Sequence, residues 1–246
     1  MTFPDGTLRP DAPLRVVGDV HGDARGFSAA LAGAPFVVQL GDLTDAAPEH
    51  APDSAEVLRL ALDMRDAGRG MFLLGNHDHK LARALEGRGV RIAPALAATL
   101  AALPAALAAR ALAAIRAAPA WARCGESFFV HGAFHSAMLN QPPPAWSARP
   151  DGVLSRALFG QTTARRQPDG FPERVLDWVD RIPAGMTVYC GHDDRSSDGR
   201  PARRRGAAGG EAVFMDTGAG KGGHLSWVDL PPRTAEEGDR GCAWRD

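Results

Sequence analysis

Short apolar runs alternate with polar clusters along most of the chain. The runs are rich in Val, Leu, Phe and Met and have the length of buried strands. Strands are predicted at residues 14–17, 36–40, 71–74, 127–130, 187–190, 212–215 and 225–230. Between the early runs, apolar residues recur at helical spacing, which predicts helices at residues 24–32, 54–67 and 81–85.

Strands that alternate with helices predict an α/β fold. The later strands have fewer helices between them, which indicates a mixed sheet or a second sheet. We expect Ser54 to cap the helix that it begins. Residues 92–120 predict a helical insertion of two or three amphipathic helices, and residues 141–171, rich in Pro, Arg and Gly, predict a cap-like loop. We expect one domain over residues 1–246.

Composition, net charge and the cysteine pattern limit which partners and which cellular compartment are expected. The chain has 246 residues, 45% of them hydrophobic, and a net charge of −1, so nothing general favours a nucleic acid or a membrane surface as partner. The Ala/Leu-rich stretch is interrupted by Pro104 and Arg110, so we expect no membrane span. Cys124, Cys190 and Cys242 form no CxxC pair, and the N-terminus has no apolar signal segment. Free thiols and a cytoplasmic location are therefore expected.

Five of the predicted strands end in a polar cluster: GDVHGD, GDLTD, GNHDH, HGAFH and GHDD. The donors at these ends are Asp19, His21, Asp42, Asn76, His131 and His192. Because ligands gather at the carboxyl ends of strands in α/β folds, these side chains are expected to meet. Asp19 and His21 can reach one cation, and Asp42 can bridge two. Nitrogen and oxygen donors without thiolates suit Mn, Fe, Zn or Ni.

The ordered series GDVHGD, GDLTD, GNHD, HG and GH resembles the calcineurin-like metallophosphoesterase superfamily. The later DTGAGKGGHLSWVDL resembles the branch of bacterial serine/threonine phosphatases, symmetrical dinucleoside tetraphosphatases and polynucleotide kinase-phosphatases. The segment ALFGQTTARRQPDGFPERV, from Ala157, is most similar to the phosphatase module of the last group. This resemblance implies a four-layer αββα sandwich, with the predicted helical insertion added to it.

The resemblance also implies a role for each residue. It implies two metal ions, with manganese as the first candidate and iron, zinc or nickel as alternatives. The implied ligands are Asp19 and His21 for the first ion, Asp42 as the bridge, and Asn76, His131 and His192 for the second ion. His77 is implied to be the general acid, with Asp45 holding its ring, since an adjacent carboxylate keeps an imidazole charged. Metal-activated water would then hydrolyse a phosphomonoester or a nucleotide polyphosphate.

Other residues near these motifs are given supporting roles. Asp216, which begins DTGAGKGG, is a candidate acceptor for a ligand histidine. Asp78 is expected to accept hydrogen bonds in its turn, whereas His79 is expected at the surface. Lys221 is a candidate for phosphate contact, although no P-loop motif is present. Asp194 stands where many superfamily members have a second histidine ligand, and it is left out of the ligand set.

One departure from the family pattern concerns the substrate phosphate. The family motif GDxxDRG appears here as GDLTDAA, so Ala46 replaces the phosphate-binding arginine. The candidates to replace it are Arg165, Arg166 and Arg195. The basic stretch at residues 200–205 is expected to be a solvated loop. Two alternatives therefore stay open: a phosphodiesterase or nuclease, favoured slightly by the basic run at residues 203–205 within that stretch, and a catalytically weakened binding module. The substrate stays open between a phosphorylated small molecule, a nucleotide and a phosphoprotein.

Overall fold

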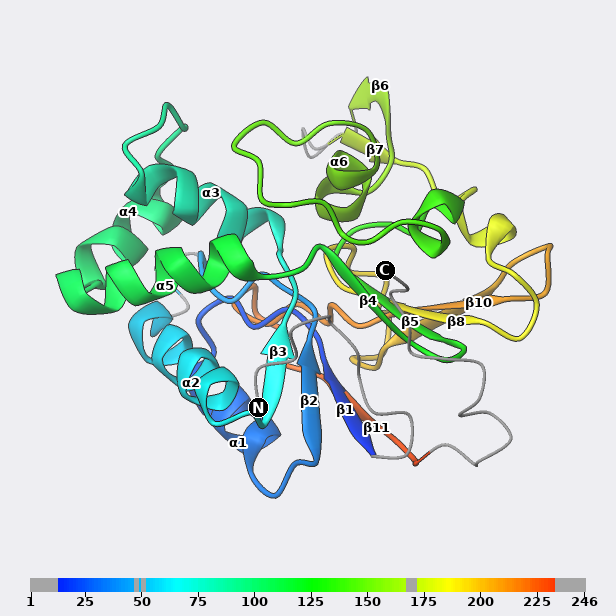
Figure 1. Ribbon diagram of the computed structural model, residues 1–246, viewed down its shortest axis with the longest axis horizontal. Helices are drawn as coiled ribbons and strands as arrows, with labels where there is room; N and C mark the ends of the chain where they lie inside the picture. Colours follow the sequence, from blue (N-terminus) through cyan, green and yellow to red (C-terminus); the bar gives the residue numbers. More distant parts are fainter. Residues whose placement is uncertain (1–12, 47–48, 50–51, 167–171, 233–246) are drawn as a thin grey trace.

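Two facing β-sheets with helices on their outer sides make up the protein (Figure 1). The computed structural model describes residues 13–46, 49, 52–166 and 172–232. The first sheet has the order β11–β1–β2–β3, and the second has the order β4–β5–β8–β10–β9. The strands are β1 Leu14–Val17, β2 Phe36–Gln39, β3 Gly70–Phe72, β4 Trp121–Cys124, β5 Ser127–Val130, β6 Thr162–Arg166, β7 Pro172–Arg174, β8 Thr187–Cys190, β9 Ala202–Arg205, β10 Glu211–Phe214 and β11 Trp227–Leu230.

Alternating side chains fill the space between the sheets. Val16 and Val38 are partners on neighbouring strands of the first sheet, and Phe129, Tyr189 and Val213 form a row across the second. All five belong to one buried cluster that joins the two sheets. The residues between them point outward into a second cluster, as the two-residue period of a strand requires. The sheets are therefore apolar on both faces.

Helices cover both outer faces and complete four layers (Figure 1). Helices α1 and α2 lie on the first sheet, whereas α6 and the short helices η2 and η3 pack on the second. The helices are α1 Ala24–Leu31, α2 Ser54–Asp66, α3 Asn76–Leu85, α4 Pro94–Ala102, α5 Ala105–Ala117, η2 Ser136–Leu139, α6 Gly152–Phe159 and η3 Val179–Arg181. This arrangement confirms the predicted αββα sandwich.

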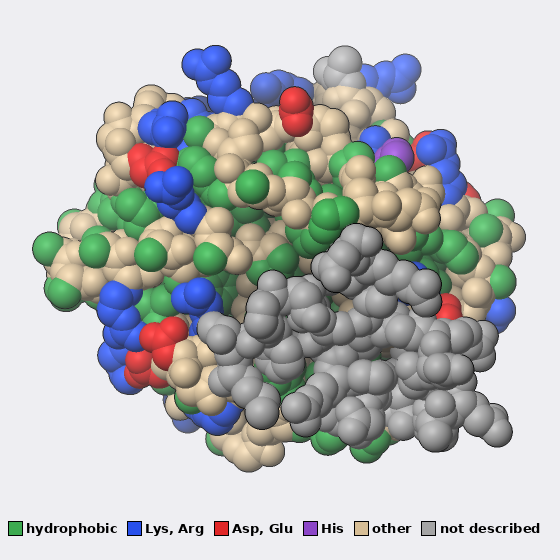
Figure 2. Space-filling view, in the orientation of Figure 1, with side chains coloured by type: hydrophobic (Ala, Val, Ile, Leu, Met, Phe, Trp, Pro, Cys, Tyr) green, Lys and Arg blue, Asp and Glu red, His purple; other side chains and the backbone are tan. Residues whose placement is uncertain are grey.

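The predicted insertion forms two helices, α4 and α5, which pack against α2 and α3. Charged side chains of both signs lie next to one another over α2 and α5 (Figure 2), where Arg59 pairs with Asp63 and Arg110 with Asp66. Within the described residues, no single helix is long and apolar enough to cross a bilayer. Helices α4 and α5 pass that test only together, and they are bent by 119° relative to each other.

Three local predictions were wrong. The cap of α2 is Asp53, whose side chain accepts from the backbone N–H of Glu56, so Ser54 is the first helical residue. The basic run at 200–205 contains the edge strand β9 rather than only a loop, because its backbone pairs with β10. The segment 141–171 contains α6 and the strand β6. Residues 167–171 and Cys242 lie outside the described residues.

Truncation of a side chain between the sheets should destabilise the protein strongly. Leu73 is fully buried in the inter-sheet cluster, so Leu73→Ala should lower the free energy of unfolding by about 2–5 kcal/mol in urea denaturation. Ile92 is 50% exposed, and Ile92→Ala should change it by less than about 0.5 kcal/mol. Similar losses in the two variants would contradict this packing.

Candidate metal centre

Parallel strand pairing brings the polar motifs to one end of the sandwich. Strands β1, β2 and β3 run parallel in the first sheet, and β5, β8 and β10 run parallel in the second. The carboxyl ends of all six strands therefore open into loops at the same edge. Each predicted donor lies in one of these loops or at the start of the helix that follows.

The loops place the donors in two groups that share Asp42. In each group the candidate ligand atoms all lie within 4.8 Å of one another. The first group contains Asp19, His21 and Asp42, and the second contains Asp42, His131 and His192. Asn76 lies beside the second group, since its Oδ1 is 2.9 Å from His131 Nε2. The structure thus brings all six predicted donors together, in an arrangement that could hold two cations.

Backbone strain is concentrated in the same loops. In the described part of the chain, four residues other than glycine have a positive φ: His21 at 44°, Asp42 at 58°, Asp45 at 71° and His192 at 65°. This region of conformational space is unfavourable for residues with a Cβ, and strain of this kind clusters at functional sites. The fold therefore tolerates four strained residues where the candidate ligands converge.

Backbone carbonyls orient two of the histidine rings. His21 Nδ1 lies 3.0 Å from the carbonyl oxygen of Thr44, and His131 Nδ1 lies 3.0 Å from that of Leu40. A carbonyl can only accept, so each Nδ1 carries a proton, and Nε2 is the nitrogen that a neutral ring offers to a metal ion. His131 Nε2 points to Asp42, 3.4 Å from its Oδ2. Both rings thus present the atom that a metal ion would use.

Buried polar atoms without partners indicate where a cation fits. Asp19 Oδ1 and His192 Nε2 are buried, and among the described residues neither has a hydrogen-bond partner. The backbone N–H of His192 donates to the other oxygen, Asp19 Oδ2, at 2.9 Å. A Cβ at Gly191 would collide with Asp19, so this glycine permits the close approach of the two loops. The donor set fits metal ions.

The buried carboxylates and histidines of the centre shift one another's pKa values. Burial opposes the charge of His131, but Asp42 and Asp19 outweigh burial and raise its pKa to about 9. For Asp42, burial is outweighed by His131 and His77, which hold the pKa well below its usual range. Burial dominates at His21 and lowers its pKa to about 4. Burial and the nearby Asp216 raise the pKa of Asp19 well above its usual range, because both disfavour the ionised carboxylate.

The proposed acid pair lies beside the first group. His77 Nδ1 is 3.1 Å from Asp45 Oδ2, and the backbone N–H of His77 donates to Asp42 Oδ1 at 2.8 Å. Burial alone would lower the pKa of His77, but Asp42 and Asp45 raise it. The side chain of His77 is 29% exposed, whereas that of Asp45 is fully buried. An imidazolium held in this way could donate a proton to a leaving group.

Asp78 ties two of the motif loops together. Its carboxylate is fully buried and accepts from the backbone N–H groups of Asp42, Leu43 and Gly75 at 2.8–3.1 Å. Burial and the charge of Asp42 raise its pKa to about 6, whereas the N–H donors lower it. Asp78 is therefore a turn-stabilising acceptor, as the sequence predicted, and it also fixes the backbone of the shared ligand.

Asp216 lies close to the centre, but within the described part of the chain no hydrogen bond joins it to a histidine. Its oxygens accept from the ammonium of Lys221 and from the backbone N–H of Gly218. The predicted hydrogen bond to a ligand histidine is therefore not the one observed. Asp194 is exposed, and its Oδ1 accepts from the backbone N–H of Ser196.

The three arginines predicted to contact phosphate are not brought together. Arg165 and Arg166 are exposed on β6, which pairs with β7 in a hairpin outside the two main sheets. Arg195 follows the His192 loop, and its Nη2 lies 3.7 Å from Asp193 Oδ2. Their contact with substrate stays a prediction.

His79 was wrongly predicted to lie at the surface. It is 2% exposed, and its Nε2 lies 2.8 Å from the carbonyl oxygen of Ser147. Its ring also packs near Trp146 and Phe159. Burial lowers the pKa of His79. This histidine joins α3 to the segment predicted as a cap, a long-range contact that no local pattern signals.

Sequence reasoning also missed Arg174, on β7. Its Nε lies 3.0 Å from Asp193 Oδ1, and its Nη1 donates to the carbonyl oxygen of Phe159. Its charge contributes to lowering the pKa of His192, although burial is the larger cause. A single arginine outside any motif carries no signal in the sequence, so only the fold places it beside the centre.

The chain is similar in sequence to known proteins. Residues 12–193 match the model of the family described as calcineurin-like phosphoesterase. A protein of Geobacillus thermodenitrificans named bis(5'-nucleosyl)-tetraphosphatase PrpE [asymmetrical] is 27% identical over 243 residues, 90% of this chain and 91% of that protein. A protein of the same name from Halalkalibacterium halodurans is 27% identical over 237 residues, 88% of this chain and 89% of that protein.

A solved structure has the same fold. A serine/threonine phosphatase from Saccharomyces cerevisiae superposes with a TM-score of 0.61 and 12% identity, over 94% of this chain and 85% of that one. At this identity, the likeness shows the fold alone. The family match covers most of the chain, so the protein belongs to the calcineurin-like phosphoesterase family. It is a phosphoric ester hydrolase of a class that depends on two metal ions.

Removal of the Asp78 carboxylate should destabilise the folded protein. Asp78→Asn would place amide hydrogens against backbone N–H donors, so the free energy of unfolding should fall by about 1–3 kcal/mol. Asp63 is a matched control, because its side chain is 48% exposed. Asp63→Asn should cost less than about 1 kcal/mol. Equal losses in urea denaturation would show that the three N–H contacts of Asp78 stabilise the fold no more than the exposed ion pairs of Asp63 do.

Proposed function

We propose that the protein hydrolyses dinucleoside tetraphosphates asymmetrically, into a nucleoside triphosphate and a nucleoside monophosphate. The observation that carries the proposal is the pair of ligand groups that share Asp42, next to a histidine–aspartate pair. The substrate comes from the relatives, which are named asymmetrical tetraphosphatases. The branch that the sequence resembles includes symmetrical tetraphosphatases beside two other groups of phosphatases, and symmetrical and asymmetrical cleavage give different products.

We propose that the first ion binds Asp19, His21 and Asp42, and that the second binds Asp42, Asn76, His131 and His192. Ions bound there supply the positive charge that activates water and neutralises phosphate oxygens. Manganese is the proposed metal, because the donors are nitrogen and oxygen atoms without thiolates. Iron, zinc and nickel satisfy the same chemistry. Two further statements stay predictions: that the protein is cytoplasmic, and that residues 1–246 form a single domain.

In the proposed reaction, His77 donates a proton to the oxygen of the departing phosphate. Asp45 holds the imidazole through Nδ1, which leaves Nε2 as the nitrogen that can deliver a proton to the substrate. The raised pKa of His77 keeps the ring protonated more readily than a free imidazole. A partly exposed imidazole can reach a bound substrate, whereas the buried Asp45 cannot.

A nuclease is less well supported. The basic run that favoured it lies on the edge strand β9, and two of its arginines are paired with carboxylates of the fold. Arg203 pairs with Glu211 at 2.6 Å, and Arg204 lies 3.8 Å from Asp180. These ion pairs leave the run less positive than the sequence suggested.

Replacement of His77 should remove proton donation without removing the metals. We expect His77→Asn to lower kcat on phenyl phosphate about 10²–10⁴-fold. The loss on p-nitrophenyl phosphate should be smaller, since p-nitrophenol is the stronger acid and leaves more readily without help. Manganese content, measured by elemental analysis, should stay at the wild-type level. Wild-type activity in this variant would exclude His77 as the acid.

Product analysis decides the position of cleavage. Manganese-loaded protein incubated with diadenosine tetraphosphate should give AMP and ATP, resolved by anion-exchange chromatography. Treatment with a chelator should abolish turnover, and added manganese should restore it. Two molecules of ADP would show symmetrical cleavage instead. Turnover of p-nitrophenyl phosphate without turnover of the dinucleotide would refute this substrate and retain the phosphoesterase.

A further inference from the structure

The glycine-rich loop after β10 packs directly over position 46. A Cβ built on Gly220 would lie 2.7 Å from the Cβ of Ala46 and 2.7 Å from that of His21, which is closer than real side chains approach. Gly220 also has a φ of 67°. Ala46 is only 3% exposed, so its small side chain and the glycine fit together. The loop thus fills the space that a large side chain at position 46 would need.

This loop brings a cation to the same place. The ammonium of Lys221 lies 3.1 Å from Asp216 Oδ2, and Asp216 is fully buried at the start of the loop. An ammonium has three N–H donors. Among the described residues, Asp216 is the one partner of the Lys221 ammonium in a hydrogen bond or ion pair. The side chain is 51% exposed, so the remaining donors are accessible to a ligand.

Lys221 is electrostatically coupled to the metal-binding carboxylates. Burial lowers the pKa of Lys221, but Asp216, Asp19 and Asp42 outweigh burial and raise it. In turn, the charge of Lys221 helps to lower the pKa of His21 and His192, for which burial is the main cause. The lysine is therefore a cation at neutral pH, and it acts on both ligand groups.

The choice of lysine is unusual for this chain. Of its 28 basic residues, only Lys80 and Lys221 are lysines. Both lie at the centre, since Lys80 Nζ is 3.9 Å from Asp45 Oδ2, beside the acid pair. A compact ammonium can bind a phosphate oxygen as a point charge, whereas the planar guanidinium of arginine needs a wider approach.

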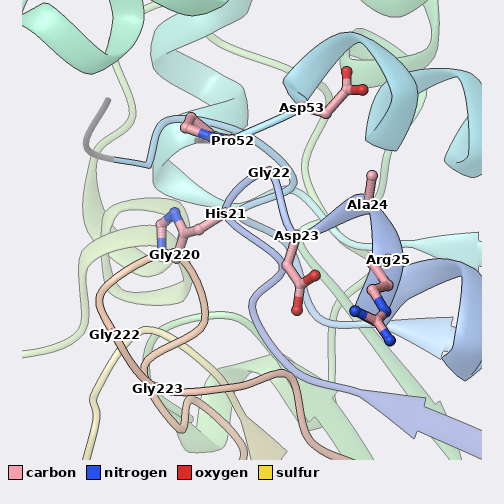
Figure 3. Close-up of a pocket in the computed structure, with 10 residues that line it drawn as sticks. All are labelled: His21, Gly22, Asp23, Ala24, Arg25, Pro52, Asp53, Gly220, Gly222 and Gly223. Atoms are coloured by element: carbon pink, nitrogen blue, oxygen red, sulfur yellow. The ribbon is translucent and has the colours of Figure 1, made fainter. Parts of the chain in front are cut away.

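An open pocket adjoins the loop (Figure 3). It has a volume of about 460 Å³, and His21 and Gly220 lie on one side of it, with Arg25 on the other. Gly220 and Gly222 both line it, and Lys221 stands between them in the chain. A phosphate chain entering here would meet His21 and the loop together.

We propose that Lys221 binds a non-bridging oxygen of the substrate phosphate and replaces the arginine that is absent at position 46. This assignment rests on the proposed phosphoesterase function. Ala46 and Gly220 allow the loop to approach, and Asp216 holds the ammonium in position. The loop after β10, rather than the loop after β2, then supplies the positive charge for the phosphate.

The test compares Lys221→Gln with the wild type, both loaded with manganese. Isothermal titration with inorganic phosphate gives the Kd, and kinetics on diadenosine tetraphosphate give kcat and KM separately. We expect the phosphate Kd and the KM to rise about tenfold, the size of one lost charge-assisted hydrogen bond. Manganese content and Tm should stay close to wild type. Lys221→Arg should restore part of the phosphate affinity, because it keeps the charge.

Arg110→Gln is the matched control. The side chain of Arg110 is 49% exposed and its Nη2 lies 2.9 Å from Asp66, a setting like that of Lys221, but it lies on α5. This variant should keep the wild-type phosphate Kd.

Two results would overturn the proposal for Lys221. One is an unchanged phosphate Kd in Lys221→Gln. The other is a loss of manganese from Lys221→Gln while the molecules that still hold manganese bind phosphate with wild-type affinity. In that case Lys221 would only balance the charge of Asp216. If phosphate binding depends on Lys221 but the dinucleotide is not hydrolysed, the proposed substrate is wrong and the phosphate-binding role stands.

Discussion

Four aspartates lie buried around one edge of the sandwich: Asp19, Asp42, Asp78 and Asp216 are each no more than 2% exposed. Several carboxylates cannot remain ionised together in a buried place unless positive charge or N–H donors surround them. Three backbone N–H groups satisfy Asp78, and an ammonium satisfies Asp216. What remains is the charge of Asp19 and Asp42, which histidines balance only in part. Bound metal ions would neutralise this excess of negative charge.

The two sheets make this concentration of charge possible. Six parallel strands open at one edge, so short loops can present donors from both sheets to the same point. The loops must turn sharply to do so, and His21, Asp42, Asp45 and His192 adopt positive φ values as a result. Each costs roughly 1–3 kcal/mol, which the large apolar core between and outside the sheets can offset.

The loop at residues 216–223 shows how one small residue can reorganise a site. With alanine at position 46, the loop packs down on His21 and places Lys221 near the ligands. The candidate metal donors and the His77–Asp45 pair are in place without an arginine at position 46. The proposed phosphate contact comes instead from the loop that follows β10. The weakened binding module that the sequence left open receives no support from this geometry.

The sequence by itself determined seven of the eleven strands in the described part of the chain, the order of the polar motifs and the residues that could bind metals, because each is a local pattern. A two-residue period predicts a strand, and a polar cluster after it marks a loop at the sheet edge. Only the tertiary structure decided that His79 is buried against Ser147, that Arg174 lies near His192, and that Gly220 covers Ala46. These contacts join residues far apart in the chain, so their existence depends on the packing of whole elements and leaves no periodic trace in the sequence.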